Sequence, residues 1–546
     1  MKRKTGAIAL VLVLLVGIFA LGCGGNGENG GNGGNGGDGG NTGSDGIDYN
    51  GTININLPQK DFKYEDNALQ AVADAYMDKH PQTTINIVNQ PSSTYKEWLD
   101  SQFAGGSDTT SADIVQTLLI SNAYTTSRLV DYSTYLVKPN PYHNNTLWKD
   151  VLQPDAYPLY DDRSGIYELN FSTNMSMFFY NKEIWKAAGL VENGVDMVPE
   201  TWDELVEFAK KIKETANKYP LAIGGATYVT GSTSWLFNVY GDQYYRDLAD
   251  DVHAQAGDYC YDPDIDATWS LDLSDPDLDA AYKYTQNPLR FFNGVMEGEW
   301  TPSDARYQGM LENFKKLMPT YTQPNMTTNN YYQAEEYFWS GDAAMVFNTT
   351  EFFNSYKTLF DSRPEGHKFE IGYFPAPPMQ GTGDKAPASQ TVRSVGGAVG
   401  WYGVVKKDRK QNDLVMDFMM FWGSKEGQDI YNESIRSQDA YVSGASLVNS
   451  VEVTEDIYPA ADIEFPGLCH NNPVGNFWGN IFSMNGSSSA YMAFESACKR
   501  LFDNNMSVLQ FGEQMTKAIQ AGIPQYLKSM GWRENAWQTP SQHPAV

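Results

Sequence analysis

A chain of 546 residues is too long for a single hydrophobic core, so two or more lobes are expected. Its 67 acidic residues outnumber its 39 basic residues and give a formal net charge of −28. A surface with this charge repels anionic polymers, which argues against a DNA or RNA partner and leaves neutral and cationic ligands open.

The first residues are typical of a secretory signal. Residues 2–4 are all basic, and the apolar run from Ala7 to Leu21 is shorter than the roughly 20 residues that span a bilayer as a helix. The run leads into Ala20-Leu21-Gly22-Cys23, which resembles a bacterial lipobox. This resemblance implies a signal peptide over residues 1–22 and a lipid such as palmitate on Cys23, which anchors the protein outside the cell membrane. The alternative is an ordinary secreted protein.

A tether follows the signal. From Gly24 to Asp48 the chain consists almost entirely of Gly and Asn, with a repeated Gly-Asn-Gly-Gly unit. Gly-rich chain behaves as flexible coil, and about 25 such residues have a typical reach of about 25–30 Å. We therefore assign residues 23–48 to the lipidated Cys and its tether, and expect a folded body from residue 49 onwards.

The body begins with a strand, a helix and a second strand. Thr52–Leu57 and Thr84–Val88 alternate apolar and polar residues as strands do, and a helical pattern lies between Asp66 and Pro81. This order predicts a parallel pair with a right-handed crossover, which Ala112–Val115 extends as a third strand.

Ligands of open parallel sheets bind beyond the carboxyl ends of the strands. Gln59 follows the first predicted strand, and Gln116 and Thr117 follow the third. These three residues are therefore candidates for ligand contact on fold grounds alone.

Two later helices are also clear. Thr201-Trp-Asp-Glu204 is a capping box, which predicts that a helix begins there with one apolar face. A second helix is expected from Asp413 to Trp422, where Met and aromatic residues recur at helical spacing and indicate core packing.

Three cysteines and one acidic stretch are the candidates for a disulfide or a metal site. Cys260, Cys469 and Cys498 fit no zinc spacing, and either one disulfide or buried thiols is compatible with the sequence. Asp262, Asp264 and Asp266 alternate like the start of a calcium loop. The glycine and the closing glutamate of that motif are replaced by Ala267 and Leu273, so no metal and no cofactor is expected, although calcium binding stays open.

Five segments occur in the order of a known family. They are Phe178–Leu190, Val198–Leu205, Ser340–Met345, Val395–Trp401 and Phe418–Gln428. With them the chain resembles extracellular solute-binding protein family 1 of ABC importers, the group that includes maltose-binding protein.

The resemblance implies an α/β, two-lobe periplasmic-binding-protein-like fold of type II, with hinge strands between the lobes and a ligand cleft at their interface. Lobe 1 is expected over residues 49–165 plus about 390–450, and lobe 2 over residues 166–389 plus about 451–546. The implied function is to capture a carbohydrate, an oligosaccharide, by hinge closure and to deliver it to the permease subunits of the importer. A monomer is the expected state.

Sugars offer hydroxyl groups to polar side chains and C–H faces to aromatic rings. On the family's pattern, glycines let the backbone approach a ligand and the amino end of a helix offers N–H groups. The ligand-binding candidates are Gln59, Gln116, Thr117, Thr230, Gly231, Ser232, Trp235, Glu351, Gly396, Gly397, Trp401 and Trp478. A pure capping role for Ser232 and a solvated surface position for Glu351 stay open.

Two other classes of protein are compatible with parts of the sequence. A binder of a peptide, a polyamine or another small solute is compatible with the same fold. A surface-anchored glycoside hydrolase needs only two suitably spaced carboxylates, which the sequence does not exclude, but no hydrolase motif is recognisable. We therefore expect a binding protein and not an enzyme.

Overall fold

The computed structural model describes residues 46–59, 63–106, 110–117, 120, 122–158, 165–225, 232–364, 368–398, 400–463, 467–469 and 489–545. The predicted signal peptide, Cys23 and the tether up to residue 45 lie outside these residues. The chain divides into two compact units. Unit 1 takes its described residues from Gly24–Asn174 and Ala398–Asp462, and unit 2 takes its from Met175–Gly397 and Ile463–Val546.

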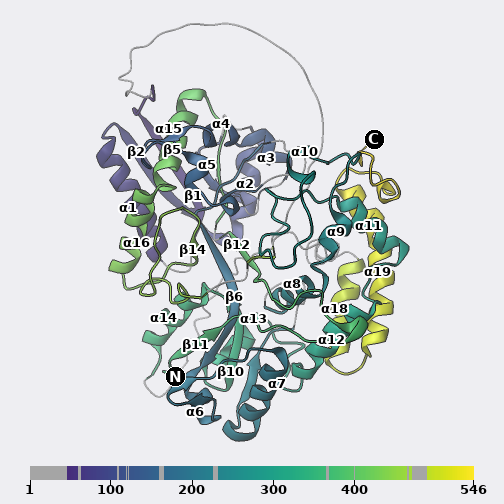
Figure 1. The fold of residues 1–546 in the computed structure, drawn as a ribbon. Coiled ribbons are helices and arrows are strands. Elements are labelled where there is room, and N and C mark those ends of the chain that lie inside the picture. Colours follow the sequence, from purple (N-terminus) through teal and green to yellow (C-terminus); the bar gives the residue numbers. More distant parts are fainter. Residues whose placement is uncertain are drawn as a thin grey trace, which may run out of the picture. The chain divides into compact units, whose positions relative to one another are not determined.

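Unit 1 is built on a four-stranded sheet with the order β13-β3-β1-β2, of which β1 and β2 are labelled in Figure 1. Its strands are β1 (Gly51–Pro58), β2 (Thr83–Gln90), β3 (Ile114–Gln116) and β13 (Tyr402–Val404). β1 pairs in parallel with both β2 and β3, and Ile55 lies opposite Ile87 and Ile114. These pairings confirm the strands predicted from alternation. β13 is antiparallel to β3 and comes from a distant part of the chain.

Helices cover both faces of this sheet. Ile53, Ile55 and Leu57 of β1 are buried in one cluster with residues of α1 (Lys63–Lys79), α15 (Arg409–Trp422) and the partly buried side of α16 (Lys425–Ser437). On the other face, β3 and α2 (Tyr95–Ala104) contribute to a second cluster. The stripe on α15 is core, as predicted. The remaining elements of unit 1 are α3 (Asn122–Arg128), α4 (Ser133–Leu136), β4 (Pro139–Asn140), β5 (Thr146–Leu147), α5 (Trp148–Val151) and β14 (Ala445–Ser446).

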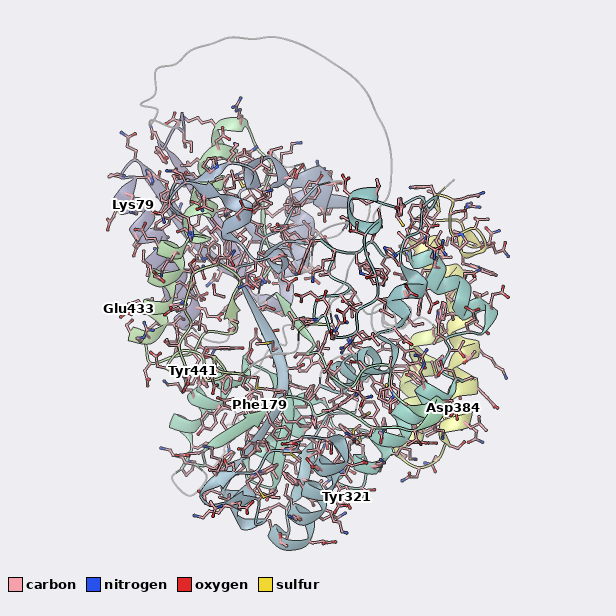
Figure 2. The ribbon with its side chains drawn as sticks, in the orientation of Figure 1. Lys79, Phe179, Tyr321, Asp384, Glu433 and Tyr441 are labelled. Atoms are coloured by element: carbon pink, nitrogen blue, oxygen red, sulfur yellow. The ribbon has the colours of Figure 1, made fainter. Side chains whose placement is uncertain are left out.

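The second large sheet has the order β11-β6-β10-β9. Its strands are β6 (Ser172–Asn181), β9 (Tyr219–Ala222), β10 (Ala343–Thr349) and β11 (Ile371–Phe374), and β12 (Gly396–Ala398) and β14 also pair with β6. β10 is parallel to β9 and antiparallel to β6. Phe179, which lies near the carboxyl end of β6 and is labelled in Figure 2, is fully buried. The sheet is therefore the centre of the unit 2 core.

Unit 2 is rich in helices. They are α6 (Lys182–Ala187), α7 (Trp202–Lys211), α8 (Ser232–Tyr245), α9 (Leu248–Val252), α10 (Pro263–Asp266), α11 (Pro288–Glu297), α12 (Ala305–Leu317), α13 (Tyr331–Trp339), α14 (Phe352–Ser362), α18 (Ser489–Phe502) and α19 (Val508–Ser529), beside the small hairpin of β7 (Val191–Glu192) and β8 (Val195–Asp196). The cap of α7 is confirmed because the Thr201 hydroxyl accepts from Glu204 N at 3.2 Å, although the Glu204 carboxylate accepts from Glu200 N and not from Thr201 N. Among the helices that the structure describes, none combines the length and apolar character required to cross a membrane.

The acidic stretch beside α10 is a helix cap. Asp262 accepts from Asp264 N at 3.0 Å, and Asp266 accepts from Asp262 N at 2.8 Å and from Thr285 N at 2.9 Å. Within the described ranges, no group of three or more His, Cys, Asp or Glu side chains is arranged to hold a metal ion. In the same ranges no disulfide links Cys260, Cys469 and Cys498.

Candidate functional site

The carboxyl edge of the unit 1 sheet brings together three of the predicted ligand residues. Gln116 is the last residue of β3 and Thr117 follows it, and they are 5% and 2% exposed. Thr117 donates from its backbone N to Trp401 O at 2.8 Å and from its hydroxyl to the same oxygen at 3.2 Å. A Cβ added at Gly400 would meet both Tyr402 OH (2.8 Å) and Gln116 Nε2 (3.1 Å), so the backbone there passes close to both side chains. Gln59 is exposed and donates from its backbone N to Gln90 O at 2.6 Å.

A recess opens in unit 1 near this edge. It encloses about 680 Å³, including the solvent at its mouth, and we call it the unit 1 recess. Its lining consists of Leu57, Glu65, Asp66, Leu69, Phe171, Ser172, Tyr402, Trp422, Gln428, Tyr431, Asn432, Val442, Ser443, Gly444, Ser446 and Val453. Two of the lining residues, Phe171 and Tyr402, lie within five residues of a place where the chain passes from one unit to the other.

Aromatic rings form one wall of the recess. The ring centroids of Tyr402 and Trp422 are 4.6 Å apart, and those of Phe171 and Trp422 are 5.1 Å apart. Phe171 and Trp422 are nearly fully buried, whereas Tyr402 is half-buried. The mutual packing of the rings fixes their orientation, so Tyr402 can present a rigid face to a ligand.

Polar groups also line the recess. Glu65 and Asp66 lie in the first turn of α1, and Ser443 donates a short hydrogen bond to the Glu65 carboxylate. Burial, together with the nearby carboxylate of Glu65, raises the pKa of Tyr431 well above its ordinary value. Gln428 is held by a hydrogen bond from its Nε2 to Trp422 O at 3.0 Å. The recess therefore combines carboxylates, amides and hydroxyls with an aromatic wall.

The predicted residues of unit 2 lie near the carboxyl ends of β9 and β10. Ser232 is buried in the first turn of α8, and the half-buried ring of Trp235 stands edge-on to Tyr331 with 6.2 Å between centroids. Glu351 is half-buried and comes shortly after β10. A Cβ on Gly224 would lie 2.8 Å from Tyr331 N. Glycine is therefore required where the chain that follows β9 passes close to the start of α13.

Glu335 is the perturbed carboxyl group of this region. It lies on α13, and its Oε1 accepts from Asn348 Nδ2 at 2.7 Å. Burial raises its pKa to about 7, although hydrogen bonds with Tyr331, Trp339 and Asn348 act in the opposite direction. Near neutral pH the protonated and ionised forms of this side chain are therefore both populated.

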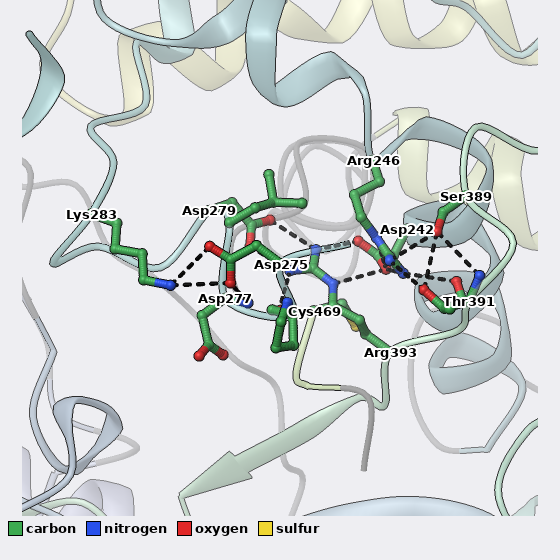
Figure 3. Close-up of polar contacts among 12 residues, drawn as sticks. Asp242, Arg246, Asp275, Asp277, Asp279, Lys283, Ser389, Thr391, Arg393 and Cys469 are labelled. Atoms are coloured by element: carbon green, nitrogen blue, oxygen red, sulfur yellow. Dashed lines mark hydrogen bonds and ion pairs between the residues drawn. The ribbon is translucent and has the colours of Figure 1, made fainter. Parts of the chain in front are cut away.

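Figure 3 shows a buried network of ion pairs around Arg393, which lies three residues before β12. Arg393 donates to Asp279 through Nη1 (2.6 Å) and Nη2 (2.9 Å), and to Asp242 through Nε (3.1 Å) and Nη2. Arg246 donates at 2.7 Å to Asp242 Oδ2, the oxygen that also accepts from Arg393 Nε. It donates to Ser389 Oγ at 3.0 Å. Burial alone would raise the pKa of Asp242, but the guanidinium groups of Arg393 and Arg246 outweigh it and hold that pKa below its usual range.

The network fixes the chain that leads into the predicted glycine pair. After Arg393, the Ser394 hydroxyl accepts from Ser176 N at 2.9 Å, and Val395 O accepts from the same N at 3.0 Å. Gly396 and Gly397 then begin β12 and are half-buried. The glycines are thus held on β6 of unit 2 at the residue where the chain leaves that unit.

A model of the bacterial extracellular solute-binding protein family matches residues 61–429, which is more than half of the chain. The chain belongs to this family. Solute-binding proteins of this group are extracellular binding proteins, and the family resemblance of the sequence segments is confirmed.

Solved structures support the fold of this solute-binding protein. A family 1 extracellular solute-binding protein from Bifidobacterium longum subsp. infantis is 17% identical, with a TM-score of 0.51 over 86% of this chain and 98% of that chain. The cyclic alpha-maltosyl-1,6-maltose binding protein from Arthrobacter globiformis is 14% identical, with a TM-score of 0.51 over 86% and 98%. The apo-form of RafE from Streptococcus pneumoniae is 16% identical, with a TM-score of 0.51 over 88% and 98%. These likenesses confirm the predicted α/β solute-binding fold. No curated protein sequence matches the chain.

The predicted ligand residues of the solute-binding protein fall into three groups. Gln116, Thr117 and Trp401 lie together in unit 1, with Gln59 on a neighbouring loop of that unit. Ser232, Trp235, Glu351, Gly396 and Gly397 lie in unit 2. Thr230, Gly231 and Trp478 lie outside the described residues. Ligand contact by these residues stays a prediction.

Sequence reasoning missed the residues that line the recess. Two signals for them were present in the sequence: Glu65 and Asp66 begin the helix after the first strand, and Tyr402 is the neighbour of Trp401. Ser443 and Tyr431 carry no such signal, because only the folded chain places them beside Glu65.

Proposed function

We propose that this solute-binding protein captures a carbohydrate, an oligosaccharide, outside the cell and delivers it unchanged to the permease subunits of an ABC importer. In this proposal, a lipid on Cys23 and the Gly/Asn-rich tether hold the protein at the membrane, and the two units are the lobes that close around the sugar. The protein acts as a monomer.

The observation that carries the proposal is the unit 1 recess. Its aromatic wall suits the C–H face of a sugar ring, and its carboxylates, amides and hydroxyls suit sugar hydroxyls. Two structures with this fold, a chitin oligosaccharide binding protein at a TM-score of 0.50 and the cyclic alpha-maltosyl-1,6-maltose binding protein, bind carbohydrates by their names and support the same class of ligand.

The connectivity of the units supports closure as part of this proposal. The chain passes from unit 1 to unit 2 after Asn174, returns after Gly397 and passes again after Asp462. Connections of this kind are compatible with hinge bending, in which a few residues between two units absorb the change in their arrangement. A sugar shifts the equilibrium towards the closed state only if it makes more contacts there, and the permease then recognises that state.

The test is a thermal-shift screen of the purified protein against mono- and oligosaccharides, with the peptide trialanine and the polyamine spermidine as the other classes. A ligand at one hundred times its Kd adds about 2.7 kcal/mol to the free energy of unfolding, which raises Tm by several degrees. We expect a shift with an oligosaccharide that is recovered intact after incubation. Shortened sugar would identify a hydrolase, and a shift with trialanine or spermidine alone would contradict the carbohydrate assignment.

A further inference from the structure

Ser394 joins the segments by which the chain enters, leaves and re-enters unit 2. Its hydroxyl accepts from Ser176 N at 2.9 Å, close after the chain enters the unit. Its backbone N donates to Gly467 O at 3.0 Å, and its carbonyl oxygen accepts from Cys469 N at 3.0 Å, close after the chain re-enters the unit. Ser394 itself lies shortly before Gly397, the residue after which the chain leaves. We call Ser176, Ser394, Gly467 and Cys469 the crossing node.

Arg393 attaches this node to the body of unit 2. Its side chain is fully buried and donates to both carboxylate oxygens of Asp242 and both of Asp279, with Cys469 beside it in Figure 3. Its Nη1 also donates to Pro276 O at 3.1 Å. A Cβ on Gly467 would lie 2.6 Å from the same oxygen. Arg393 and the crossing node therefore share the Pro276 carbonyl group as well as the peptide bond to Ser394.

The contacts of Arg393 need a guanidinium group and not only a positive charge. The N–H groups of Arg lie in one plane and reach two carboxylates and a carbonyl oxygen in a fixed arrangement, whereas the ammonium group of Lys is a compact point charge on a flexible stem. The arrangement fixes the orientation of the backbone from residue 393 onwards. Gly396 and Gly397, two of the predicted ligand residues, follow on this backbone.

A binding segment that is held in place lowers the cost of binding, because the solute does not have to order it. The apparent affinity falls in proportion to the fraction of molecules that hold the competent arrangement. If a loosened node keeps that arrangement for about a tenth of the time, the apparent Kd rises about tenfold. A buried residue that never meets the solute can therefore set its affinity.

We propose that Arg393 is a positioning residue for solute binding, which keeps the crossing node and the glycines of β12 in the arrangement that the solute requires. This inference rests on the proposed function and adds to it a residue that acts on the solute through the backbone.

The experiment compares Arg393→Lys with Arg290→Lys by isothermal titration. Maltotriose, cellotriose, xylotriose and chitotriose are the probes, and the one that the wild type binds most tightly is titrated into each variant. Arg290 is the matched control, because it makes a separate two-bond ion pair with Asp258 in the same unit, at 2.7 and 2.9 Å.

We expect Arg393→Lys to raise Kd at least about tenfold and Arg290→Lys to leave Kd within about threefold of the wild type. The stoichiometry of the titration reports the folded fraction, whereas Kd reports the affinity of the folded molecules. A residue that only stabilises the fold would therefore change the stoichiometry or Tm and leave Kd unchanged.

A second pair of variants leaves the buried charges in place. Ser394→Ala removes the hydroxyl that accepts from Ser176 N, and it is expected to raise Kd at least about threefold. Ser303→Ala is its control, because it removes a hydroxyl that forms a hydrogen bond with Thr516 Oγ1 at 2.9 Å in the same unit. We expect this control to leave Kd within about twofold of the wild type.

The outcomes separate the two proposals. If folded Arg393→Lys binds the probe as tightly as the wild type, or if Arg290→Lys weakens binding equally, the inference is overturned and carbohydrate binding survives. Where Arg393→Lys does not fold, the same criteria apply to Ser394→Ala and Ser303→Ala. If the wild type binds none of the trisaccharides, there is no carbohydrate affinity for Arg393 to set, and both the inference and the proposed function fail.

Discussion

At the scale of single residues, Glu335 gives the molecule a specific dependence on pH. Its pKa is about 7 in the folded protein, because burial disfavours the charged form, and near 4.5 in the unfolded chain. Between these two values the folded state holds a proton that the unfolded state has lost, so the free energy of unfolding falls as the pH rises from about 4.5 to about 7.

Glu335→Gln removes this dependence. In chemical unfolding experiments at pH 5 and pH 8, we expect the wild type to lose about 2 kcal/mol relative to the variant between the two values. Gln keeps an oxygen that can accept from Asn348 Nδ2, so the comparison isolates the ionisation. If the free energies of unfolding of the wild type and the variant differ by the same amount at pH 5 and pH 8, the Glu335 carboxyl group is ionised throughout this range and the prediction is wrong.

The positions of single residues could be predicted from the sequence where they lie at the end of a strand. Gln116 and Thr117 were placed at the sheet edge because strand ends are visible as breaks in alternation, and the structure puts Trp401 beside them. The partners of Glu65 and Glu335 were not predictable, since Ser443 and Asn348 approach them only through packing of separate helices and loops. Burial, which sets the pKa of Glu335, is also not visible in its neighbours along the chain.

At the scale of elements, the segment that enters β12 is held by the buried ion pairs of Arg393. The Arg393 side chain is fully buried, and that of Arg246 is nearly so. Two carboxylates and two guanidinium groups balance in formal charge, which is the condition under which buried ions are tolerated.

Arg393→Met is expected to cost about 3–5 kcal/mol of unfolding free energy, because it removes the cation that Asp279 binds through both carboxylate oxygens. The measurement is the guanidinium chloride midpoint at neutral pH. Arg436→Met is the matched control, since Arg436 makes exposed ion pairs with Glu433 and Asp456 and should cost at most about 1 kcal/mol. Equal losses in the two variants would contradict a stabilising role for the network.

Elements with a local signature were predicted well. The cap at Thr201 marked the start of α7, alternation marked β1 and β2, and the apolar stripe marked α15. The network around Arg393 had no such signature, because Asp242 and Asp279 are separated from it by 151 and 114 residues along the sequence. Charged residues read in isolation are expected at the surface, and only the fold shows that these are buried.

At the scale of the whole molecule, the proposed function predicts that ligand binding changes the arrangement of the two units. We expect small-angle X-ray scattering to show a smaller radius of gyration when the protein is saturated with the sugar that gives the largest thermal shift. The control is a sugar of equal size that gives no thermal shift. An unchanged radius of gyration at saturation would contradict hinge closure.

Unit 1 is made from two stretches of chain, and this order has a consequence for biosynthesis. β13 completes the sheet beside β3, but residues 175–397 of unit 2 are translated between them. A nascent polypeptide therefore cannot finish its amino-terminal unit until translation has passed Val404, and contacts of such long range form slowly. Until then β1, β2 and β3 lack the fourth strand of their sheet.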